Sequence, residues 1–483
     1  MLQFYQQIDR SQRLRALLLL IIKQLLILTI AVKFMREGLL GKYSGAVPRY
    51  TSYPTAPHFH EGIGCDKYAQ WLQNLGKGQD ISLYIHIPYC DRLCWFCACH
   101  TKHTLKYDPI TAYLEALYSE IARVGALVDR AATVSAVHFG GGSPTMLKPE
   151  DMIALMAALR EHFTFRDDAE ISVEMDPNDL DDARYDALAA IGMTRASLGV
   201  QDFNPDVQKA INRIQTFEHT RGVVDAVRAR GVHSVNCDIL YGLPYQTLET
   251  LEATVRDILS LAPDRIALFG YAHVPWMKKH QTMIPEEALP GVEMRFRQMN
   301  RAAEMLVEAG YEPIGIDHFA KPGDKLAVAS REGRLHRNFQ GYTDDAADAL
   351  IGLGASSIGQ LPEGYVQNMP ATGEYQKMAL GQGLTAVRGI ELTDDDRMRA
   401  KVIEDLMCRF AFSFADLRNR FPKIAEAVIA EARQYVASNG DGVCEIVDDR
   451  FRITETGKPF TRSIAAVFDS YLSSGKGRHS IAV

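Results

Sequence analysis

The sequence predicts an α/β protein made of a partial (β/α) barrel and a C-terminal, mainly helical domain. From residue 81 onward, short β-branched segments alternate with turns and helical stretches, which is the pattern of βα units and a parallel sheet. Polar and glycine residues follow these segments directly, as they do at the carboxyl ends of barrel strands. Beyond residue 390 the alternation stops and the pattern becomes mainly helical. These three observations together indicate the fold class.

The predicted strands are short runs of aliphatic and β-branched residues bounded by turn residues. They cover Ile81–Ile87, Val134–Phe139, Glu170–Glu174, Arg195–Val200, Ser234–Leu240, Arg265–Tyr271 and, with a weaker pattern, Tyr311–Ile316. Helical periodicity fills the intervals, for example over Pro109–Val128 and Leu248–Leu261. We expect the strands to be parallel and to curl into a barrel or partial barrel.

Polar or glycine residues stand at the end of each of the first six predicted strands. In chain order they are Tyr84 and His86, the run Gly140–Gly141–Gly142–Ser143–Pro144, Glu174 with Asp176, Gln201 with Asp202, Asp238 with Tyr241, and Tyr271–Ala272–His273. Any one of these groups could be a cap or a turn. Their repetition in the same place on successive strands predicts an active site at the carboxyl edge of the sheet.

The region after residue 390 has a different character. Thr393–Phe410 is predicted to be a capped helix, and a second helix follows over Ile424–Ser438. Val443–Val447 and Arg450–Ile453 form a predicted hairpin around an Asp-Asp turn, so the whole resembles a winged helix. The acidic turn disfavours DNA binding, and we expect this domain to be a lid over the barrel mouth.

The chain is predicted to divide into five parts. They are an N-terminal extension foreign to the native fold (1–34), a segment that packs near the active site (35–80), the barrel (81–320), a connection that covers the barrel (321–390) and the C-terminal domain (391–483). Ala16–Val32 is apolar but carries Lys23 near its middle, where insertion into a bilayer costs about 2.5–3.5 kcal/mol. We therefore interpret translation as starting at Met35, with no membrane anchor.

The composition fits a large soluble enzyme. Of 483 residues, 47% are hydrophobic and 23% charged, which suffices for a full core. The net charge of -7 gives no general attraction to nucleic acid or to anionic membranes. No coiled-coil pattern demands a partner copy, so we expect a monomer. Eight cysteines are too few for a disulfide scaffold in a chain of this length, which favours the reducing cytoplasm.

The most informative motif is Cys90-x-x-x-Cys94-x-x-Cys97. Three thiolates at this spacing can hold a [4Fe–4S] cluster and leave its fourth iron open for chemistry. A structural zinc site is the alternative, supported by the nearby His100 and His103 but weakened by the lack of a second Cys-x-x-Cys pair. The motif therefore favours an iron–sulfur cluster.

The glycine run after the second strand is weak evidence by itself, because glycines often only make a turn. It lacks the Gly-x-Gly-x-x-Gly spacing and the following acid of a dinucleotide site. Glycine lets backbone groups approach a ligand closely. Beside the cysteine loop, that ligand could be the amino and carboxylate end of a methionine-derived cofactor.

Together these segments resemble the radical S-adenosylmethionine (SAM) enzymes and, within them, the oxygen-independent coproporphyrinogen III oxidases. The likeness runs from about residue 44 to the C-terminus. The segments that carry it are Pro48–Pro54, the cysteine loop with Phe96 and the fourth cysteine Cys99, Gly199–Phe203, Asp238–Pro244, Tyr271–His273 and Arg337–Thr343.

The resemblance implies a set of cofactor-binding residues. Cys90, Cys94 and Cys97 would hold the [4Fe–4S] cluster, whereas Cys99 would not be a ligand. A first SAM would bind the open iron and contact Tyr84, Phe96, Gly141, Glu174, Ala272 and Ile358. A second SAM would contact Gly142, Ser143, Gln201, Arg213 and Asp238. Ser143 stands where the family often has threonine and keeps the hydroxyl.

The resemblance also implies a reaction. A 5′-deoxyadenosyl radical would abstract hydrogen from a propionate side chain of coproporphyrinogen III, and carbon dioxide would leave, so that a vinyl group remains. Two propionates would react in turn to give protoporphyrinogen IX, with an electron donor such as flavodoxin or ferredoxin. The catalytic radical belongs to the cofactor, so no catalytic side chain is assigned.

The substrate carries four propionates and requires cationic partners, for which guanidinium groups are best suited. Arg49, Arg331, Arg337 and Lys321 are the candidates. A heme-binding chaperone or carrier related to these enzymes is the main alternative function. Cys99, Pro48–Pro54 and the Arg337–Thr343 segment favour the enzyme. A radical enzyme with another substrate would share every cofactor residue.

Overall fold

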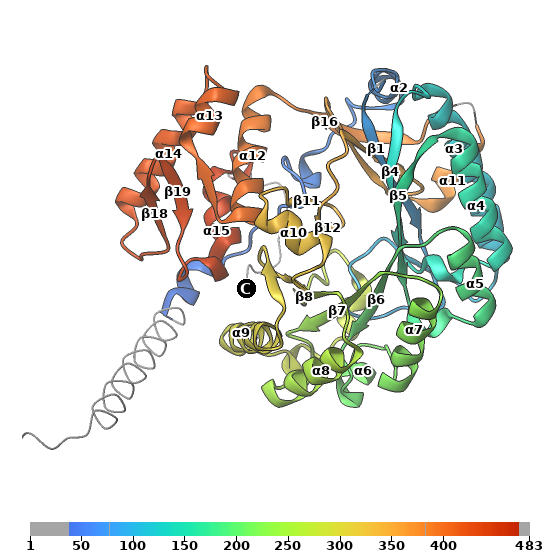
Figure 1. Cartoon of the computed structure of the whole chain (residues 1–483), viewed down its shortest axis with the longest axis horizontal. Helices are drawn as coiled ribbons and strands as arrows, with labels where there is room; N and C mark the ends of the chain where they lie inside the picture. The colour runs from blue at the N-terminus through green and yellow to red at the C-terminus, as the bar shows by residue number, and fades with distance from the viewer. Residues whose placement is uncertain (1–37, 77, 382, 473–483) are drawn as a thin grey trace, which may run out of the picture.

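The computed structural model describes residues 38–472 apart from positions 77 and 382. A large α/β lobe occupies the right of Figure 1 and a smaller C-terminal lobe the left. The predicted extension 1–34 and the start at Met35 lie outside the described residues. Among the helices that are described, none combines the length and the apolar character needed to span a bilayer.

The large lobe is built on a 12-stranded sheet in the order β16-β15-β14-β13-β1-β4-β5-β6-β7-β8-β10-β9. Its centre is parallel from β13 to β8. The central strands are β1 (Asp80–Ile87), β4 (Thr133–Gly141), β5 (Thr164–Met175), β6 (Arg195–Gln201), β7 (Ser234–Tyr241) and β8 (Arg265–Gly270). The predicted fold class, a partial barrel with a C-terminal domain, is thus confirmed, and the first six predicted strands are present.

The seventh predicted strand differs from the expectation of a parallel barrel strand. Tyr311–Ile316 contributes only the short β9 (Glu312–Ile314), which pairs antiparallel with β10 (His318–Ala320). β10 in turn pairs antiparallel with β8 and forms a hairpin with β9. Only a short turn separates β9 from β10, so there is no room for the crossover helix that a parallel neighbour requires.

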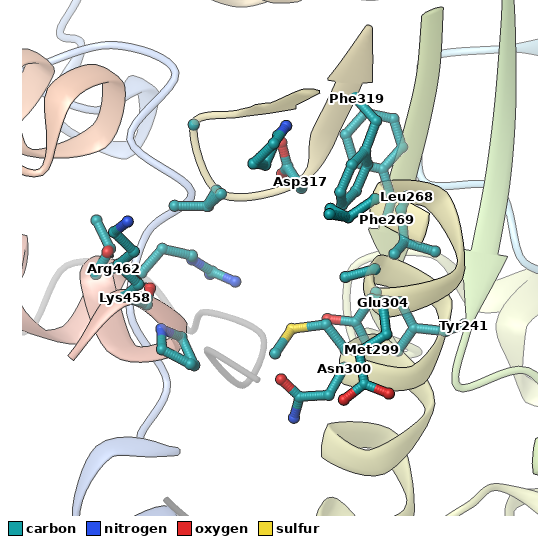
Figure 2. A pocket seen from close by; sticks show the side chains of 18 of the residues that line it. Tyr241, Leu268, Phe269, Met299, Asn300, Glu304, Asp317, Phe319, Lys458 and Arg462 are labelled. Carbon is teal, nitrogen blue, oxygen red and sulfur yellow. Dashed lines mark hydrogen bonds between the residues drawn. The ribbon is translucent and has the colours of Figure 1, made fainter. Parts of the chain in front are cut away.

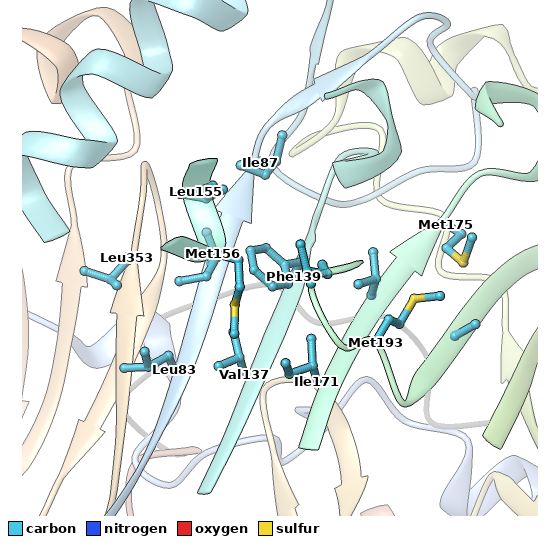
Figure 3. Packing of buried hydrophobic residues seen from close by; sticks show 14 of the residues in the cluster. Leu83, Ile87, Val137, Phe139, Leu155, Met156, Ile171, Met175, Met193 and Leu353 are labelled. Carbon is cyan, nitrogen blue, oxygen red and sulfur yellow. The ribbon is translucent and has the colours of Figure 1, made fainter. Parts of the chain in front are cut away.

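Helices cover the outer face of the parallel strands. They are α3 (Asp108–Leu127), α4 (Pro149–His162), α5 (Asp182–Ala190), α6 (Pro205–Ala210), α7 (Phe217–Ala229), α8 (Leu248–Leu261) and α9 (Val292–Glu308). Figure 3 shows Leu83, Val137, Phe139 and Ile171 of three adjacent strands packed with Leu155 and Met156 of α4. Because side chains alternate along a strand, the intervening residues of these strands point to the inner face.

The segment 321–390 is more than the expected connection over the barrel, because it extends the sheet itself. It contributes β13 (Ala349–Leu353), β14 (Ile358–Leu361), β15 (Gly364–Asn368) and β16 (Ala386–Glu391). It also contains α10 (Lys325–Arg331), β11 (His336–Asn338), β12 (Gly341–Thr343) and α11 (Thr372–Leu380). These strands are short and rich in glycine, so they carry little of the β-branched pattern that identified the others.

A buried carboxylate ties this added edge to the barrel. Glu120 of α3 accepts hydrogen bonds from the Asn368 amide (2.7 Å), the Tyr375 hydroxyl (2.7 Å) and the Gly354 backbone N–H (2.7 Å), and also from the Thr385 hydroxyl. Such a buried acid is tolerated because its oxygens are satisfied.

The C-terminal lobe matches the predicted helices and hairpin and adds a third strand. It comprises α12 (Asp394–Arg409), β17 (Ala411–Ser413), α13 (Phe414–Arg420), α14 (Ala425–Ser438), β18 (Cys444–Val447), β19 (Arg450–Ile453) and α15 (Thr461–Ala465). Thr393 and Asp396 form a capping box that starts α12, and Phe410 ends it in a left-handed conformation. Asp448 and Asp449 both have positive φ in the hairpin turn.

The N-terminal segment belongs to the C-terminal lobe as much as to the barrel. Tyr43, Val47, Tyr50 and Tyr53 are buried in the same hydrophobic cluster as the C-terminal helices. In Figure 1 this blue segment runs between the two lobes. It continues through η1 (Ala56–His58) into α2 (Cys65–Gln73), which leads to β1. Arg49 of this segment donates to the Gly270 carbonyl (3.0 Å), at the carboxyl end of β8.

Candidate active site

The three predicted cluster ligands lie on one loop after β1. The two-residue strands β2 (Tyr89–Cys90) and β3 (Lys102–His103) pair and close the base of this loop. Cys90, Cys94 and Cys97 are all free of disulfides. Burial raises the pKa of Cys90, and the nearby Cys97 and Cys94 raise it further. The loop therefore gathers three thiols close enough to affect one another's ionisation, a soft donor set that suits iron.

Cys99 has a supporting position in the same loop. Its backbone N–H donates to Cys97 Sγ at 3.4 Å. The pKa of Cys97 is lowered to about 7, mainly by a hydrogen bond between the side chains of Cys97 and Cys99. Arg213 Nη1 lies 3.6 Å from Cys94 Sγ and offsets part of the burial that raises the pKa of that thiol. Both contacts favour the thiolate form that binds a metal.

A segment that follows β8 holds the loop from outside. His280 Nε2 lies 2.7 Å from the Cys97 carbonyl oxygen, the Gln281 amide donates to the Phe96 carbonyl (2.9 Å) and Lys278 Nζ donates to the Cys99 carbonyl (2.8 Å). Gln281 is fully buried, and its amide also donates to the Ala272 carbonyl. Sequence reasoning missed these residues because they lie some 180 positions from the loop that they contact.

The glycine run forms a tight bend against the loop. Gly141 has φ +114°, and a β-carbon there would lie 2.6 Å from the ring of His86. A β-carbon on Gly142 would lie 2.6 Å from the Tyr89 carbonyl oxygen. Both positions therefore require glycine. Gly141 needs it for its backbone conformation and for space, and Gly142 needs it for space alone. The bend brings backbone N–H groups to the edge where the cysteine loop begins.

Glu174 supplies an accessible carboxylate beside this bend. It accepts hydrogen bonds from the Gly141 N–H (3.0 Å) and lies 3.0 Å from His138 Nε2, yet its side chain keeps 40% of its surface exposed. Burial favours the neutral acid, but the contacts with His138 and Gly141 hold the pKa of Glu174 below its usual value. Tyr84 stacks on the His138 ring with centroids 5.8 Å apart. An ionised carboxylate here can bind an ammonium group.

The five positions predicted for a second cofactor lie on this edge, but several already have protein partners. Arg213 forms an ion pair with Asp176 (3.0 Å) and donates to the Gly199 carbonyl (2.5 Å). The Ser143 hydroxyl donates to Asp179 (2.6 Å). Asp238 accepts from Asn236 (2.7 Å), and burial raises its pKa to about 6.

Gln201 lies close to Arg213, because both side chains approach the position of a β-carbon on Gly199. Gln201 itself has φ +71°. Ile358 begins the antiparallel strand β14, which places it where the parallel strands end. The structure thus brings all the predicted cofactor contacts to one edge of the sheet.

A cavity of about 600 Å³ lies between the barrel and the C-terminal lobe. Figure 2 shows Arg462 and Lys458 on one side, facing Met299, Asn300 and Glu304 of α9 across the space. Tyr241, Gly270 and Tyr271, at the carboxyl ends of β7 and β8, line its wall. The cavity therefore opens from the same edge of the sheet as the cysteine loop.

Four arginines line this cavity, and they come from four separate parts of the chain: Arg49, Arg295, Arg337 and Arg462. The Arg337 side chain is only 5% exposed, and its Nε and Nη1 have no hydrogen-bond partner in the described part of the chain. Asp317 approaches Nη1 no closer than 3.8 Å. Burial, with the charge of Arg49, lowers the pKa of Arg462 to about 10. The cavity thus concentrates buried positive charge.

Two of the four predicted cationic residues are not at this site. Lys321 pairs with Asp264 (3.2 Å), which precedes β8, so it lies at the amino edge of the sheet. Arg331 pairs with Glu312 at the surface (2.6 Å). The cavity is instead lined by Arg295 and Arg462, which sequence reasoning missed. No local motif marks these two, because helix α9 and helix α15 meet at the cavity only in the folded chain.

Comparison with known proteins identifies both lobes. Residues 84–258 match the radical SAM superfamily, and residues 392–460 match the HemN C-terminal domain. The oxygen-independent coproporphyrinogen III oxidase of Paracoccus denitrificans is 46% identical over 444 residues, which cover 92% of this chain and 98% of that protein. The enzyme of the same name from Bradyrhizobium diazoefficiens is 48% identical over 450 residues, which cover 93% of this chain and 100% of that protein.

A solved structure agrees with these sequences. Coproporphyrinogen III oxidase (HemN) from Escherichia coli, described as a radical SAM enzyme, superposes with a TM-score of 0.84 at 38% identity. The match covers 88% of this chain and 98% of that structure, so it includes both the barrel and the C-terminal lobe.

Proposed function

Since the chain belongs to the oxygen-independent coproporphyrinogen III oxidase family of radical SAM enzymes, we propose how its own residues divide the work of that reaction. The activity lies in heme biosynthesis, and the substrate is coproporphyrinogen III. In detail, we propose that the enzyme decarboxylates two propionates of the substrate oxidatively to vinyl groups, which gives protoporphyrinogen IX. The observation that carries the assignment of the substrate site is the buried, incompletely paired Arg337 in a cavity lined by four arginines.

Cys90, Cys94 and Cys97 would hold a [4Fe–4S] cluster, because they are free thiols on a loop fixed by Arg213, His280 and the backbone. When bound, the cluster and SAM supply the one-electron chemistry that starts hydrogen removal from an unactivated carbon. The remaining residues bind, orient and shield.

Glu174 and the glycine bend form the cradle for the amino-acid end of the first SAM. The ionised carboxylate would accept hydrogen bonds from the ammonium group of the cofactor. Gly141 and Gly142 let the backbone approach without steric conflict. Tyr84, Phe96, Ala272 and Ile358 would complete the contacts of this first cofactor.

A second SAM would lie toward β6 and β7, against Gly142, Ser143, Gln201, Arg213 and Asp238. Asp238 and Gln201 support this proposal, because Gln201 ends β6, Asp238 lies in the second half of β7, and neither belongs to the hydrophobic clusters of the described residues. Ser143 and Arg213 would have to share their present partners Asp179 and Asp176 with the cofactor.

The arginine cavity supplies the charge that a tetracarboxylate needs. Burying guanidinium groups together costs free energy unless anions compensate them. Within the cavity Asp317 is the nearest compensating acid, and its pKa is held low mainly by Arg337 despite burial. Bound propionates would complete the hydrogen bonds of Arg337, and bidentate pairing would fix the orientation of the macrocycle. The C-terminal lobe closes this space and so acts as a lid.

We propose that the protein acts as a monomer in the cytoplasm. All eight cysteines lie in the described residues and are free, as in a reducing compartment. We expect the reductant to be a small electron-carrier protein such as flavodoxin or ferredoxin.

The decisive experiment is anaerobic reconstitution with iron and sulfide, followed by assay of carbon dioxide release from coproporphyrinogen III in the presence of SAM and reductant. We expect two carbon dioxide molecules per substrate and formation of protoporphyrinogen IX. Tight heme binding without carbon dioxide release would instead assign the chain to the heme-carrier alternative.

A further inference from the structure

One acid in the cavity between the two lobes differs from the others. Four acids line this cavity, and three of them have mostly exposed side chains that lie beside Arg301 or Lys458: Glu304, Glu308 and Glu455. The fourth is Asp317, which lies in the turn between β9 and β10 and whose side chain is only 19% exposed. Its backbone carbonyl accepts a hydrogen bond from the Leu268 N–H of β8 (2.8 Å), which fixes the turn against the sheet.

The Asp317 carboxylate is held firmly, but only one of its oxygens is used. Oδ1 accepts a hydrogen bond from His318 Nδ1 (2.7 Å), whereas Oδ2 has no hydrogen-bond donor in the part of the chain that the structure describes. Burial favours the neutral acid, but the charge of Arg337 and the contact with His318 hold the pKa of Asp317 below its usual value. The carboxylate is therefore ionised at neutral pH and can accept a hydrogen bond from a ligand.

Asp317 is more than the counter-ion of one arginine. A guanidinium paired with a carboxylate normally closes to hydrogen-bond distance. Arg337 Nη1, however, lies 3.8 Å from Asp317 Oδ1. Burial lowers the pKa of both Arg49 and Arg462, and the charge of Asp317 offsets part of this shift in each. Asp317 is therefore within electrostatic reach of three of the four arginines that line the cavity.

This arrangement of charges matches two kinds of group on the proposed substrate. An ionised acid among the arginines is unfavourable for a ligand that offers only carboxylates, since like charges repel. Coproporphyrinogen III carries its propionates at the rim of the macrocycle and four pyrrole N–H groups at its centre. Cations on several sides of one acid thus provide partners for the rim and an acceptor for the centre.

The surroundings of Asp317 also suit pyrrole rings. In Figure 2, Asp317 lies beside Phe319, Leu268 and Phe269 and across the space from Arg462. Aromatic and aliphatic side chains at this wall can pack against the flat faces of the rings. A macrocycle that leaned on this wall would bring its N–H groups to the carboxylate.

We propose that Asp317 accepts hydrogen bonds from the pyrrole N–H groups and thereby selects the porphyrinogen over the oxidised porphyrin. The proposal rests on the proposed function, because it assumes that the cavity binds coproporphyrinogen III. In the porphyrinogen, saturated methylene bridges let the pyrrole rings tilt, so that several N–H groups can point at one carboxylate. Coproporphyrin III is conjugated and flat, and its remaining N–H hydrogens lie in the ring plane, where a carboxylate on one face does not reach them.

The test compares Asp317→Asn with the unmodified protein, both full-length and reconstituted with iron and sulfide. The Kd values of coproporphyrinogen III and of coproporphyrin III are measured by anaerobic equilibrium dialysis without SAM, so that no turnover occurs. The porphyrinogen is oxidised after dialysis and quantified by the fluorescence of the porphyrin. Glu312→Gln is the control, because Glu312 lies in the same hairpin, loses the same charge and is not among the described residues that line the cavity.

We expect Asp317→Asn to raise the Kd of coproporphyrinogen III roughly 10- to 150-fold, because a charge-assisted acceptor is lost. The Kd of coproporphyrin III should stay the same or fall, since removal of a negative charge favours any tetracarboxylate. The control variant should match the unmodified protein for both ligands. An unchanged Kd of the porphyrinogen would overturn the proposal. A change by the same factor for both ligands would also overturn it, because Asp317 would then act only through the charge of the arginines.

A measurement on the unmodified protein covers the case in which Asp317→Asn does not fold. The unmodified protein should bind coproporphyrinogen III roughly 10- to 150-fold more tightly than coproporphyrin III. Equal affinity for the two ligands within twofold would contradict selection by Asp317.

The two proposals fail in different ways. If the unmodified protein releases no carbon dioxide from coproporphyrinogen III with SAM and reductant, the proposed function fails. The two Kd values still report on Asp317 in that case, because binding needs no turnover. If carbon dioxide is released and the substitution affects both ligands alike, only the role of Asp317 fails.

Discussion

His138 Nε2 lies 3.0 Å from Glu174 Oε1, across the neighbouring strands β4 and β5. The sheet register pairs His138 with Ser172, whose hydroxyl lies 2.5 Å from His138 Nδ1. Each ring nitrogen therefore has a fixed partner, and the ring orients the Glu174 carboxylate toward the exposed side of the carboxyl edge. We therefore expect Glu174 to be the acid that binds the ammonium group of SAM.

Glu174→Gln should weaken SAM binding. The amide keeps the shape of the side chain but loses its charge, and a hydrogen bond to a charged group contributes about 1.5–3 kcal/mol. We expect the Kd of SAM to rise roughly 10- to 150-fold in equilibrium binding to the reconstituted protein. Glu170→Gln is the matched control on the same strand face. Glu170 pairs with Arg195, so its loss should lower stability and leave the SAM affinity unchanged. Equal SAM affinity in both variants would contradict the assignment.

Arg337→Gln should weaken substrate binding without preventing cofactor binding. Removing the guanidinium takes away a charge-assisted partner of a propionate, and we expect KM for coproporphyrinogen III to rise roughly 10- to 150-fold. SAM affinity should stay the same. Arg331→Gln is the control, since Arg331 is paired with Glu312 at the surface away from the cavity. An unchanged substrate KM for Arg337→Gln would remove this residue from the substrate site.

Cys94→Ala and Cys99→Ala should separate cluster ligand from supporting residue. The unmodified protein should bind about four irons per chain after anaerobic reconstitution. Cys94→Ala should lose the cluster, measured as iron and sulfide content and as the electron paramagnetic resonance signal after reduction. Cys99→Ala should keep the cluster. The backbone N–H of residue 99 donates to Cys97 Sγ, and this hydrogen bond does not depend on the side chain. Loss of iron in Cys99→Ala would make Cys99 a ligand.

Asp202 should make the stability of the protein depend on pH. Burial raises its pKa from 3.8 to about 6, although the Asn204 N–H (2.6 Å) and the Gln246 amide (2.7 Å) donate to it. Because the folded state binds this proton more tightly than the unfolded state, its contribution increases as pH falls from 7 toward 4. The gain between pH 7 and pH 4 is about 2 kcal/mol, since one pKa unit corresponds to about 1.4 kcal/mol and the unfolded carboxylate begins to bind its proton near pH 4.

The comparison with Asp202→Asn isolates this effect, since all other titrating groups are shared. We expect the free energy of unfolding in urea, measured from pH 7 to pH 4, to rise in the unmodified protein relative to the variant. A constant difference between the two proteins over this range would show that Asp202 keeps an ordinary pKa in the folded state.

Features that depend on neighbouring residues could be predicted from the sequence. The six parallel strands follow from β-branched runs, and the capped helix α12 follows from Thr393 and Asp396. The strands β13 to β16 could not be found in this way, because short glycine-rich segments become strands only when a sheet edge offers them hydrogen bonds. The same reason explains the hairpin of β9 and β10.

The sequence by itself determined the barrel class, the three-cysteine loop and the glycine bend, because each is encoded in the spacing of adjacent residues. Only the tertiary structure decided which cations surround the cavity between the two lobes. Arg295 and Arg462 were missing from the predicted set, whereas Lys321 and Arg331 lie elsewhere. The cavity forms where two lobes and the N-terminal segment meet, and such long-range convergence is set by packing of the hydrophobic clusters, which leaves no local pattern in the chain.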